Sequence, residues 1–209
     1  MNILFHFLLV LMKLIDVIYS QETEAIRFDE LPNPICFTIA NNAHAYVVDS
    51  SVFWRRDPTK RRVFRYDPDD RYLPDAAMWV ATTDNPTSEK VYIMSMRSSE
   101  FMYAGSDTDS VSDVCRNVFL RKDAREKLGQ RAKFRFYRNN TSGAFRIKNV
   151  ATGELLANTH FMYNEKLGVV CLDQSLTVNS GMEGEFDFWL YSCDEEYLQH
   201  EENARQWEI

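Results

Sequence analysis

The segment Phe37-Thr38-Ile39 returns in similar form as Val91-Tyr92-Ile93 and again as Phe145-Arg146-Ile147. The isoleucine that ends each segment lies 54 positions from the isoleucine that ends the next one. A fixed period of about 50 residues indicates that one supersecondary unit was used several times to build a common core. The repeat therefore predicts the architecture of the chain more directly than it predicts its function.

Three units are expected, at about 35–86, 89–142 and 143–193, and alternating apolar residues at the start of each are typical of a half-buried strand. Three further strand patterns follow in each unit. Apolar residues mark them at 46–48, 63–66 and 78–80, at 101–103, 118–120 and 134–136, and at 155–157, 169–172 and 186–188. The sequence thus predicts an all-β fold of three four-stranded repeats.

This organisation resembles the β-trefoil superfamily over 35–193. The resemblance implies a short barrel of six strands closed at one end by three hairpins. A sandwich and an eight-stranded barrel of lipocalin type are the alternatives, and the constant spacing of the three units argues against both. One short helical turn is expected in the second repeat, because Asp123 suits an N-cap, 124–128 favours helix and Gly129 suits the position after the C-cap.

The resemblance does not extend to a particular family. Ricin-type lectins carry a Q-x-W motif near the end of each repeat, but no Gln precedes Trp at that spacing in 78–80, 134–136 or 186–189. The opening that is characteristic of Kunitz-type inhibitors is also missing. Secreted arthropod proteins, salivary ones among them, include trefoils, and this chain is similar to them in type only.

The ends of the chain differ from the repeats. Residues 1–20 are mostly apolar and predict a secretory signal peptide, although Lys13 and Asp16 interrupt the run. A membrane anchor or a buried N-terminal helix is the alternative, but the run is short for a span. An acidic lead-in is expected at 21–34 and an acidic tail at 194–209. We expect a secreted, extracellular protein that has no membrane span in its mature form.

The chain has four cysteines, and an even number in a secreted protein, which folds in an oxidising compartment, suggests two disulfides. Four cysteines allow three pairings. In the trefoil that the resemblance implies, Cys36 enters the first strand and Cys193 leaves the last, so a bond between them would fasten neighbouring strands. Cys115 and Cys171 would then join two hairpins of the cap. This pairing is a hypothesis at this stage.

Two overlapping sequons, one at Asn139 and one at Asn140, lie between strong strand patterns, where a turn should be exposed. Either asparagine is a candidate for N-glycosylation. No nucleophile motif, zincin motif or phosphate loop is present, and only 7 glycines are available to build such loops. We therefore expect no enzyme activity, no cofactor and no metal site.

Basic residues are concentrated in a chain whose net charge is −7, which argues against nucleic acid as a partner. The segment 116–138 contains nine Lys and Arg residues and only two Asp and Glu residues. Trp54 lies beside arginines in a stretch, 50–62, that is interpreted as a long loop. The candidate ligand-binding residues are Trp54, Arg55, Arg56, Lys60, Arg61, Arg62, Arg121, Lys122, Arg125, Lys127 and Arg131.

Arginine and lysine clusters attract sulfate, phosphate and acidic protein surfaces. The first hypothesis is a monomeric binding protein for an anionic ligand, either a sulfated glycan or a nucleotide-like molecule. The alternative is a protein-directed inhibitor whose loop 50–62 enters a protease or a receptor. In a third interpretation, the basic residues bind no ligand: they lie on exposed strand faces and a solvated helix, and they pair with the acidic termini.

Overall fold

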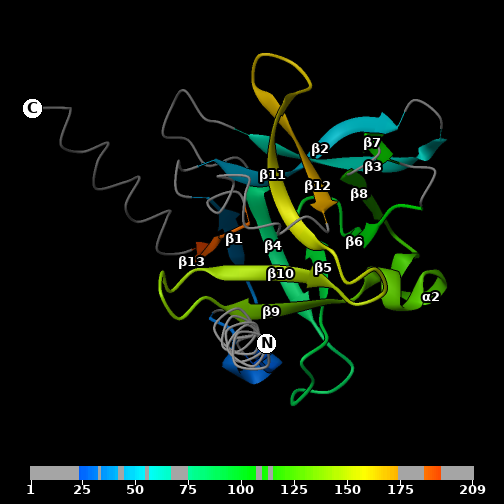
Figure 1. The fold of residues 1–209 in the computed structure, drawn as a ribbon. Coiled ribbons are helices and arrows are strands. Elements are labelled where there is room, and N and C mark those ends of the chain that lie inside the picture. The colour runs from blue at the N-terminus through cyan, green and yellow to red at the C-terminus, as the bar shows by residue number, and fades with distance from the viewer. Residues whose placement is uncertain are drawn as a thin grey trace, which may run out of the picture.

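The computed structural model describes residues 24–32, 34–41, 45–54, 57–66, 75–106, 110–112, 115–173 and 186–193. The predicted signal peptide and the acidic tail lie outside these residues, as do Arg55 and Arg56. Figure 1 shows that strands dominate the rest of the chain, so the all-β class is confirmed. Within the described part, no helix is both long and apolar enough to cross a membrane.

The strands run in chain order, with short helical turns between some of them. They are β1 (Phe37–Ala40), β2 (Tyr46–Trp54), β3 (Asp57–Tyr66), β4 (Met78–Thr82), β5 (Tyr92–Ser95), β6 (Phe101–Ala104), β7 (Ser110–Ser112), β8 (Cys115–Arg121), β9 (Phe134–Arg138), β10 (Phe145–Asn149), β11 (Leu155–Met162), β12 (Leu167–Asp173) and β13 (Trp189–Ser192). The helical turns are η1 (Phe28–Glu30), η2 (Asp75–Ala77), α2 (Ala124–Lys127) and η4 (Gly129–Ala132).

Six of these segments form a closed ring of pairings. Strand β1 pairs with both β4 and β13, β4 pairs with β5, and β9 pairs with β10, all antiparallel. Two isolated bridges complete the circle: Val91 with Phe134 joins β5 to β9, and Phe145 with Phe188 joins β10 to the approach to β13. The ring leaves no unpaired neighbour along this path, which removes the exposed edges of an open sheet.

Three hairpins, β2–β3, β6–β8 and β11–β12, meet beside this ring. Their second strands also pair with one another, since β3 pairs with β8, β8 with β12, and β12 with β3. The hairpins therefore form a triangular cap. Figure 1 shows the β11–β12 hairpin, with the strands β3 and β8 that pair with β12.

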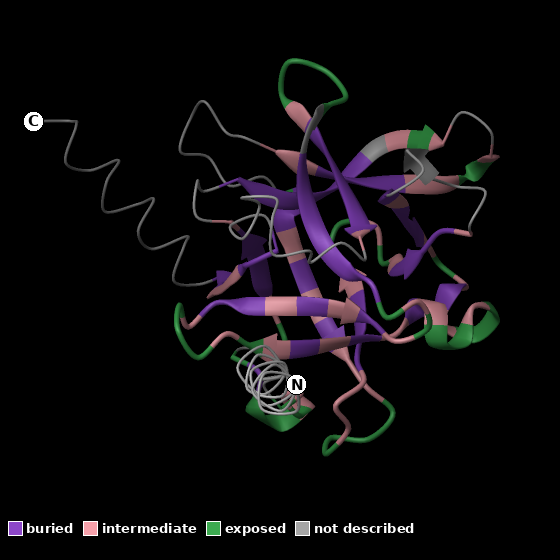
Figure 2. Cartoon of the chain, viewed as in Figure 1, coloured by how far each residue is buried: buried purple, intermediate pink, exposed green. Residues whose placement is uncertain are grey.

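The repeated isoleucines explain why ring and cap hold together. Ile39, Ile93 and Ile147 are each 0% exposed and belong to one apolar cluster in the interior. The lead-in contributes more than the sequence predicted, because Ile26 and Phe28 pack against this cluster and Leu31 is part of it. Figure 2 shows the buried residues following the strands, whereas exposed residues gather at loops and at α2.

Both disulfides of the trefoil hypothesis are present. Cys36 bonds to Cys193 and Cys115 bonds to Cys171, with Cα–Cα distances of 5.5 and 5.7 Å. The first joins the residue before β1 to the residue after β13, and the second joins β8 to β12. The predicted pairing is therefore confirmed.

The prediction of a long loop at 50–62 is wrong. Strand β2 continues to Trp54 and β3 begins at Asp57, and pairing extends to Phe53 with Arg61 and to Trp54 with Asp57. The register shifts between Asp49 and Phe53 and again between Phe53 and Trp54, as at a bulge. This irregularity, together with the run of basic residues, hides the alternation on which the sequence prediction depended.

Candidate functional site

An aromatic cluster joins the first and second hairpins of the cap. The ring of Phe119 on β8 lies 5.7 Å from the ring of Trp54 and 5.8 Å from that of Tyr103. Beside them, the rings of Tyr92 and Phe101 lie 6.0 Å apart. Trp54 was predicted to be exposed in a loop, but it is half-buried at the end of β2 because it covers Phe119.

The helical turn α2 packs directly on this cluster. Ala124 and Ala132 are both 0% exposed, and Leu128 packs beside them. Gly129 follows the C-cap Leu128 with a φ of +51°, so the chain reverses here in a conformation that glycine adopts readily. The predicted helical turn is confirmed, and it presents its polar side chains outward.

Cations cover the exposed edge of the cluster. The Arg125 guanidinium lies 4.9 Å from the centre of the Tyr92 ring, and Lys133 Nζ lies 5.1 Å from the same centre. Lys60 Nζ lies 5.4 Å from the centre of the Phe119 ring. Such contacts hold cations over an aromatic face, and of these three cations Arg125 has the most exposed side chain.

Two carboxylates near α2 are each shared by two cations. Asp84 contacts Arg125, accepts a 3.3 Å hydrogen bond from the Tyr92 hydroxyl, and lies 3.6 Å from Lys133 Nζ. Asp123 contacts Arg121 and lies 2.7 Å from Lys127 Nζ. The hydrogen bond from Arg125 lowers the pKa of Asp84, and the one from Lys127 lowers the pKa of Asp123.

We call this surface the basic face. Its cations are Arg121, Lys122, Arg125, Lys127 and Lys133, carried by the end of β8, by α2 and by the residue before β9. Lys122 is exposed and makes no ion pair with the residues that the structure describes. Five cations against three carboxylates, Asp84, Asp123 and the exposed Glu126 of α2, leave a local excess of positive charge.

Sequence reasoning did not single out three members of this site. Lys133 was counted among the basic residues but not selected as a candidate, Tyr92 was identified only as part of a repeated strand, and Asp84 was not considered. Asp84 follows β4 and Tyr92 begins β5, so both are far in sequence from α2. No local pattern predicts these contacts, because they depend on how the ring places β4 and β5 beside the turn.

The structure turns other candidate cations toward the protein itself. Arg62 is only 8% exposed. Its guanidinium lies 4.9 Å from the centres of both the Trp54 and Phe64 rings, and it donates a 2.9 Å hydrogen bond to Asn117 Oδ1. Burial lowers the pKa of Arg62. This side chain therefore fills the cap and is not available on the basic face.

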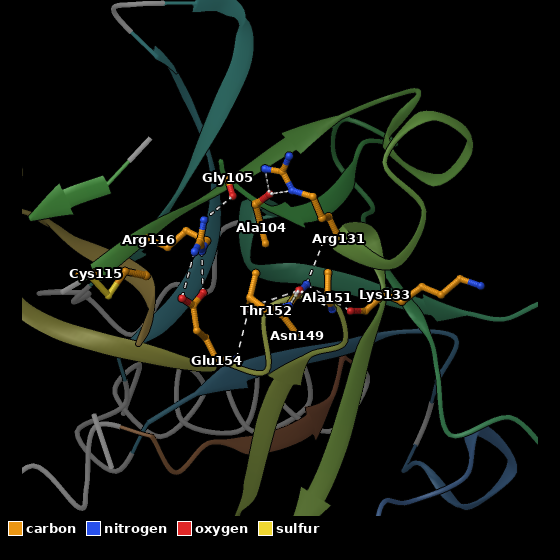
Figure 3. Close-up of polar contacts among 11 residues, drawn as sticks. Ala104, Gly105, Cys115, Arg116, Arg131, Lys133, Asn149, Ala151, Thr152 and Glu154 are labelled. Carbon is orange, nitrogen blue, oxygen red and sulfur yellow. Dashed lines mark hydrogen bonds and ion pairs between the residues drawn. A yellow bond between two sulfur atoms is a disulfide. The ribbon is translucent and has the colours of Figure 1, made fainter. Parts of the chain in front are cut away.

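Arg131 and its neighbour Arg116 fasten the second unit to the third, as Figure 3 shows. Arg131 donates two hydrogen bonds, of 3.0 and 2.6 Å, to the Ala104 carbonyl, and its own carbonyl accepts one from Asn149 Nδ2 at 2.9 Å. Arg116 forms a bidentate pair with Glu154, at 2.7 and 3.2 Å. These cations have structural partners, so the structure does not bring Arg131 to the basic face.

Among the residues that the structure describes, no three His, Cys, Asp or Glu side chains are placed to hold a metal ion. Arg61 lies between Asp49 and Glu100 and pairs with these carboxylates. The candidate residues that do meet are Trp54 and Lys60 from the first hairpin with Arg121, Lys122, Arg125 and Lys127 from the second unit. They converge because Trp54 and Lys60 both contact Phe119.

No protein-family model matches the chain, and no curated protein matches it. A salivary protein from Culex, of the Cysteine and Tryptophan-Rich family, is 16% identical, with a TM-score of 0.56 over 82% of this chain and 97% of the other. A lectin from Polyporus squamosus is 13% identical, with a TM-score of 0.58 over 78% of this chain and 50% of the lectin.

A designed threefold-symmetric protein, ThreeFoil, is 12% identical, with a TM-score of 0.54 over 75% of this chain and 98% of the design. At such identities a likeness shows the fold and not the activity. The chain therefore has a fold of β-trefoil type.

Proposed function

We propose that this protein is a secreted, monomeric and non-enzymatic β-trefoil of three four-stranded repeats that binds an anionic glycan on its basic face. The closed ring and the triangular cap support the three-repeat arrangement, and the two disulfides support an oxidising compartment. The lectin of similar fold is bound to the epitope Neu5Acα2-6Galβ1-4GlcNAc, which supports a carbohydrate as the ligand class.

The observation that carries the proposal is the sharing of Asp84 and Asp123, each between two cations. Exposed ion pairs of this kind contribute only about 0–1 kcal/mol each. A sulfate or carboxylate group of a glycan can therefore displace or bridge them with little loss. Because the cations are already held over aromatic rings or by α2, the ligand orders few new side chains when it binds.

Binding to immobilised heparin at increasing salt tests the proposal. The double variant Arg125→Gln/Lys127→Gln removes one cation from each shared carboxylate, and we expect its affinity to fall at least tenfold. The matched control is Arg138→Gln, at an exposed arginine that ends β9 and is not among the cations of the basic face. No retention of the wild type at low salt, or equal losses in both variants, would contradict the proposal.

A protein-directed inhibitor remains a second candidate because of one residue. Phe53, near the tip of the β2–β3 hairpin, is 52% exposed, and the Arg61 guanidinium lies 5.4 Å from its ring centre. An exposed aromatic ring on a hairpin tip suits insertion into a protein pocket. Inhibition of chymotrypsin-like proteases, whose specificity pocket is apolar, that is insensitive to salt and abolished by Phe53→Ser would favour this function over glycan binding.

A further inference from the structure

The turn between β9 and β10 carries two overlapping sequons, and the structure treats their asparagines differently. The turn is closed by hydrogen bonds from the Asn139 amide to the Ala144 carbonyl, at 2.8 Å, and from the Gly143 amide to the Asn139 carbonyl, at 2.7 Å. Gly143 has a φ of +76°. Both the backbone N–H and the backbone carbonyl of Asn139 therefore take part in closing this turn.

Both the oxygen and the nitrogen of the Asn139 side-chain amide make hydrogen bonds. Its Oδ1 accepts from the backbone N–H of Thr141 at 3.0 Å and of Ser142 at 3.4 Å. Its Nδ2 donates to Asp187 Oδ2 at 2.9 Å. N-glycosylation replaces one of the two Nδ2 hydrogens with the sugar, so a glycan on Asn139 would be attached to the same nitrogen that contacts Asp187.

Asp187 leaves little room for such a glycan. It is 8% exposed and also accepts hydrogen bonds from Arg146 Nε at 2.8 Å and from Ser142 Oγ at 3.3 Å. It precedes Phe188, whose bridge to Phe145 helps close the ring of strands. Withdrawing Asn139 from Asp187 would therefore remove one partner from a buried carboxylate next to a ring closure.

Asn140 has the opposite surroundings. It is exposed at the tip of the turn, and its side-chain amide makes no hydrogen bond among the residues that the structure describes. Its neighbour Thr141 is exposed as well and uses only its backbone N–H in the turn. A glycan on Asn140 can extend into solvent without disturbing a contact of the folded protein.

We propose that Asn140 is the glycosylated residue and that Asn139 is a structural residue of the turn. The oligosaccharide is transferred before the chain has folded, when both sequons are accessible. Modification of Asn140 leaves the described contacts of the turn in place, whereas modification of Asn139 crowds the contact of its Nδ2 with the buried Asp187. Adjacent acceptors compete for one glycan. Secreted, folded protein should therefore carry its glycan on Asn140. This inference rests on the secretion that the proposed function includes, and not on glycan binding.

The test is to express the full chain behind an added secretory leader in insect or mammalian cells and to map the glycan on the secreted protein. Peptide-N-glycosidase in ¹⁸O water labels the residue that carried the glycan, and peptide mass spectrometry locates the label. We expect the label on Asn140. A label on Asn139, or an unlabelled secreted protein, would overturn the proposal whatever the heparin binding of the same sample.

Two variants, each at an exposed residue, separate the two sequons without disturbing Asp187. Thr141→Ala destroys only the sequon of Asn139, and we expect the secreted protein to remain glycosylated. Asn140→Gln destroys only the sequon of Asn140, and we expect the glycan to disappear from the secreted, folded protein. Loss of the glycan in the first variant, or its full retention in the second, would contradict the assignment.

Discussion

At the scale of single residues, Arg61 shows how a cation from the basic stretch serves the interior. Its guanidinium lies 3.6 Å from Asp49 Oδ1 and 3.2 Å from Glu100 Oε2. Asp49 is 1% exposed and accepts a 2.7 Å hydrogen bond from Ser95 Oγ. Burial raises the pKa of Glu100; the charge of Arg61 opposes this rise, and the charge of Asp49 adds to it.

This arrangement predicts a pH dependence of stability. Because the pKa of Glu100 is higher in the folded protein than in the unfolded chain, the folded protein binds this proton more tightly. The free energy of unfolding should therefore fall as the pH rises from the ordinary value of 4.5 through the raised pKa. Glu100→Gln removes that contribution, so its stability relative to the wild type should improve with rising pH.

Urea denaturation of both proteins at several pH values between about 4 and 7 measures this difference. Glu126→Gln, at an exposed carboxylate on α2, is the control and should leave the pH profile of the wild type unchanged. If the stability difference between Glu100→Gln and the wild type were constant over this range, the raised pKa would make no contribution to folding.

At the scale of elements, the turn formed by α2 and η4 determines where the basic face lies. Gly129 joins the two helical turns with a φ of +51°, and a Cβ placed there would meet nothing within 4 Å. Gly129→Ala should therefore be destabilising by about 1 kcal/mol through backbone strain and not through a clash. We expect a lower midpoint in urea and weaker heparin binding, because the turn carries Arg125 and Lys127.

The exposed neighbour Gln130 provides the matched control for this substitution. Gln130→Ala adds no strain, so stability and heparin binding should both stay close to the wild type. A Gly129→Ala variant that is destabilised but binds heparin normally would show that the geometry of this turn does not matter for the ligand.

The β2–β3 hairpin shows why part of the candidate site could not be predicted. Lys60, Arg61 and Arg62 look alike in sequence, but Lys60 lies over Phe119 whereas Arg62 is buried between Trp54 and Phe64. What separates them is the strand pairing, which a bulge shifts within this hairpin. A run of like charges contains no information on which member faces inward.

At the scale of the whole molecule, the sequence was most informative where a pattern was repeated. Three isoleucines at a constant spacing predicted three equivalent core positions, and the pairing of four cysteines followed from the fold that the repeats implied. The acidic lead-in occurs once, so no repeat revealed that Ile26 and Phe28 pack against the core. The contacts of Asp84 with α2 are also unique and required the structure.

One disulfide joins the two ends of the ring of strands and the other joins two hairpins of the cap. Removing each disulfide separately should distinguish these two roles. Cys36–Cys193 spans 157 residues and Cys115–Cys171 spans 56. From the entropy of loop closure in the unfolded chain, the first should stabilise by about 5 kcal/mol and the second by about 4 kcal/mol. Cys36→Ala/Cys193→Ala should therefore lower the free energy of unfolding more than Cys115→Ala/Cys171→Ala does.

Hydrogen exchange then distinguishes opening of the ring from loosening of the cap. Without Cys36–Cys193, β1 and β13 are held by a register of only four residue pairs, from Phe37 with Ser192 to Ala40 with Trp189. Amides of these two strands should exchange faster in that variant, whereas the other variant should show faster exchange in β8 and β12. A uniform increase over the whole sheet in both variants would mean that ring and cap unfold as one unit and that neither disulfide has a local role.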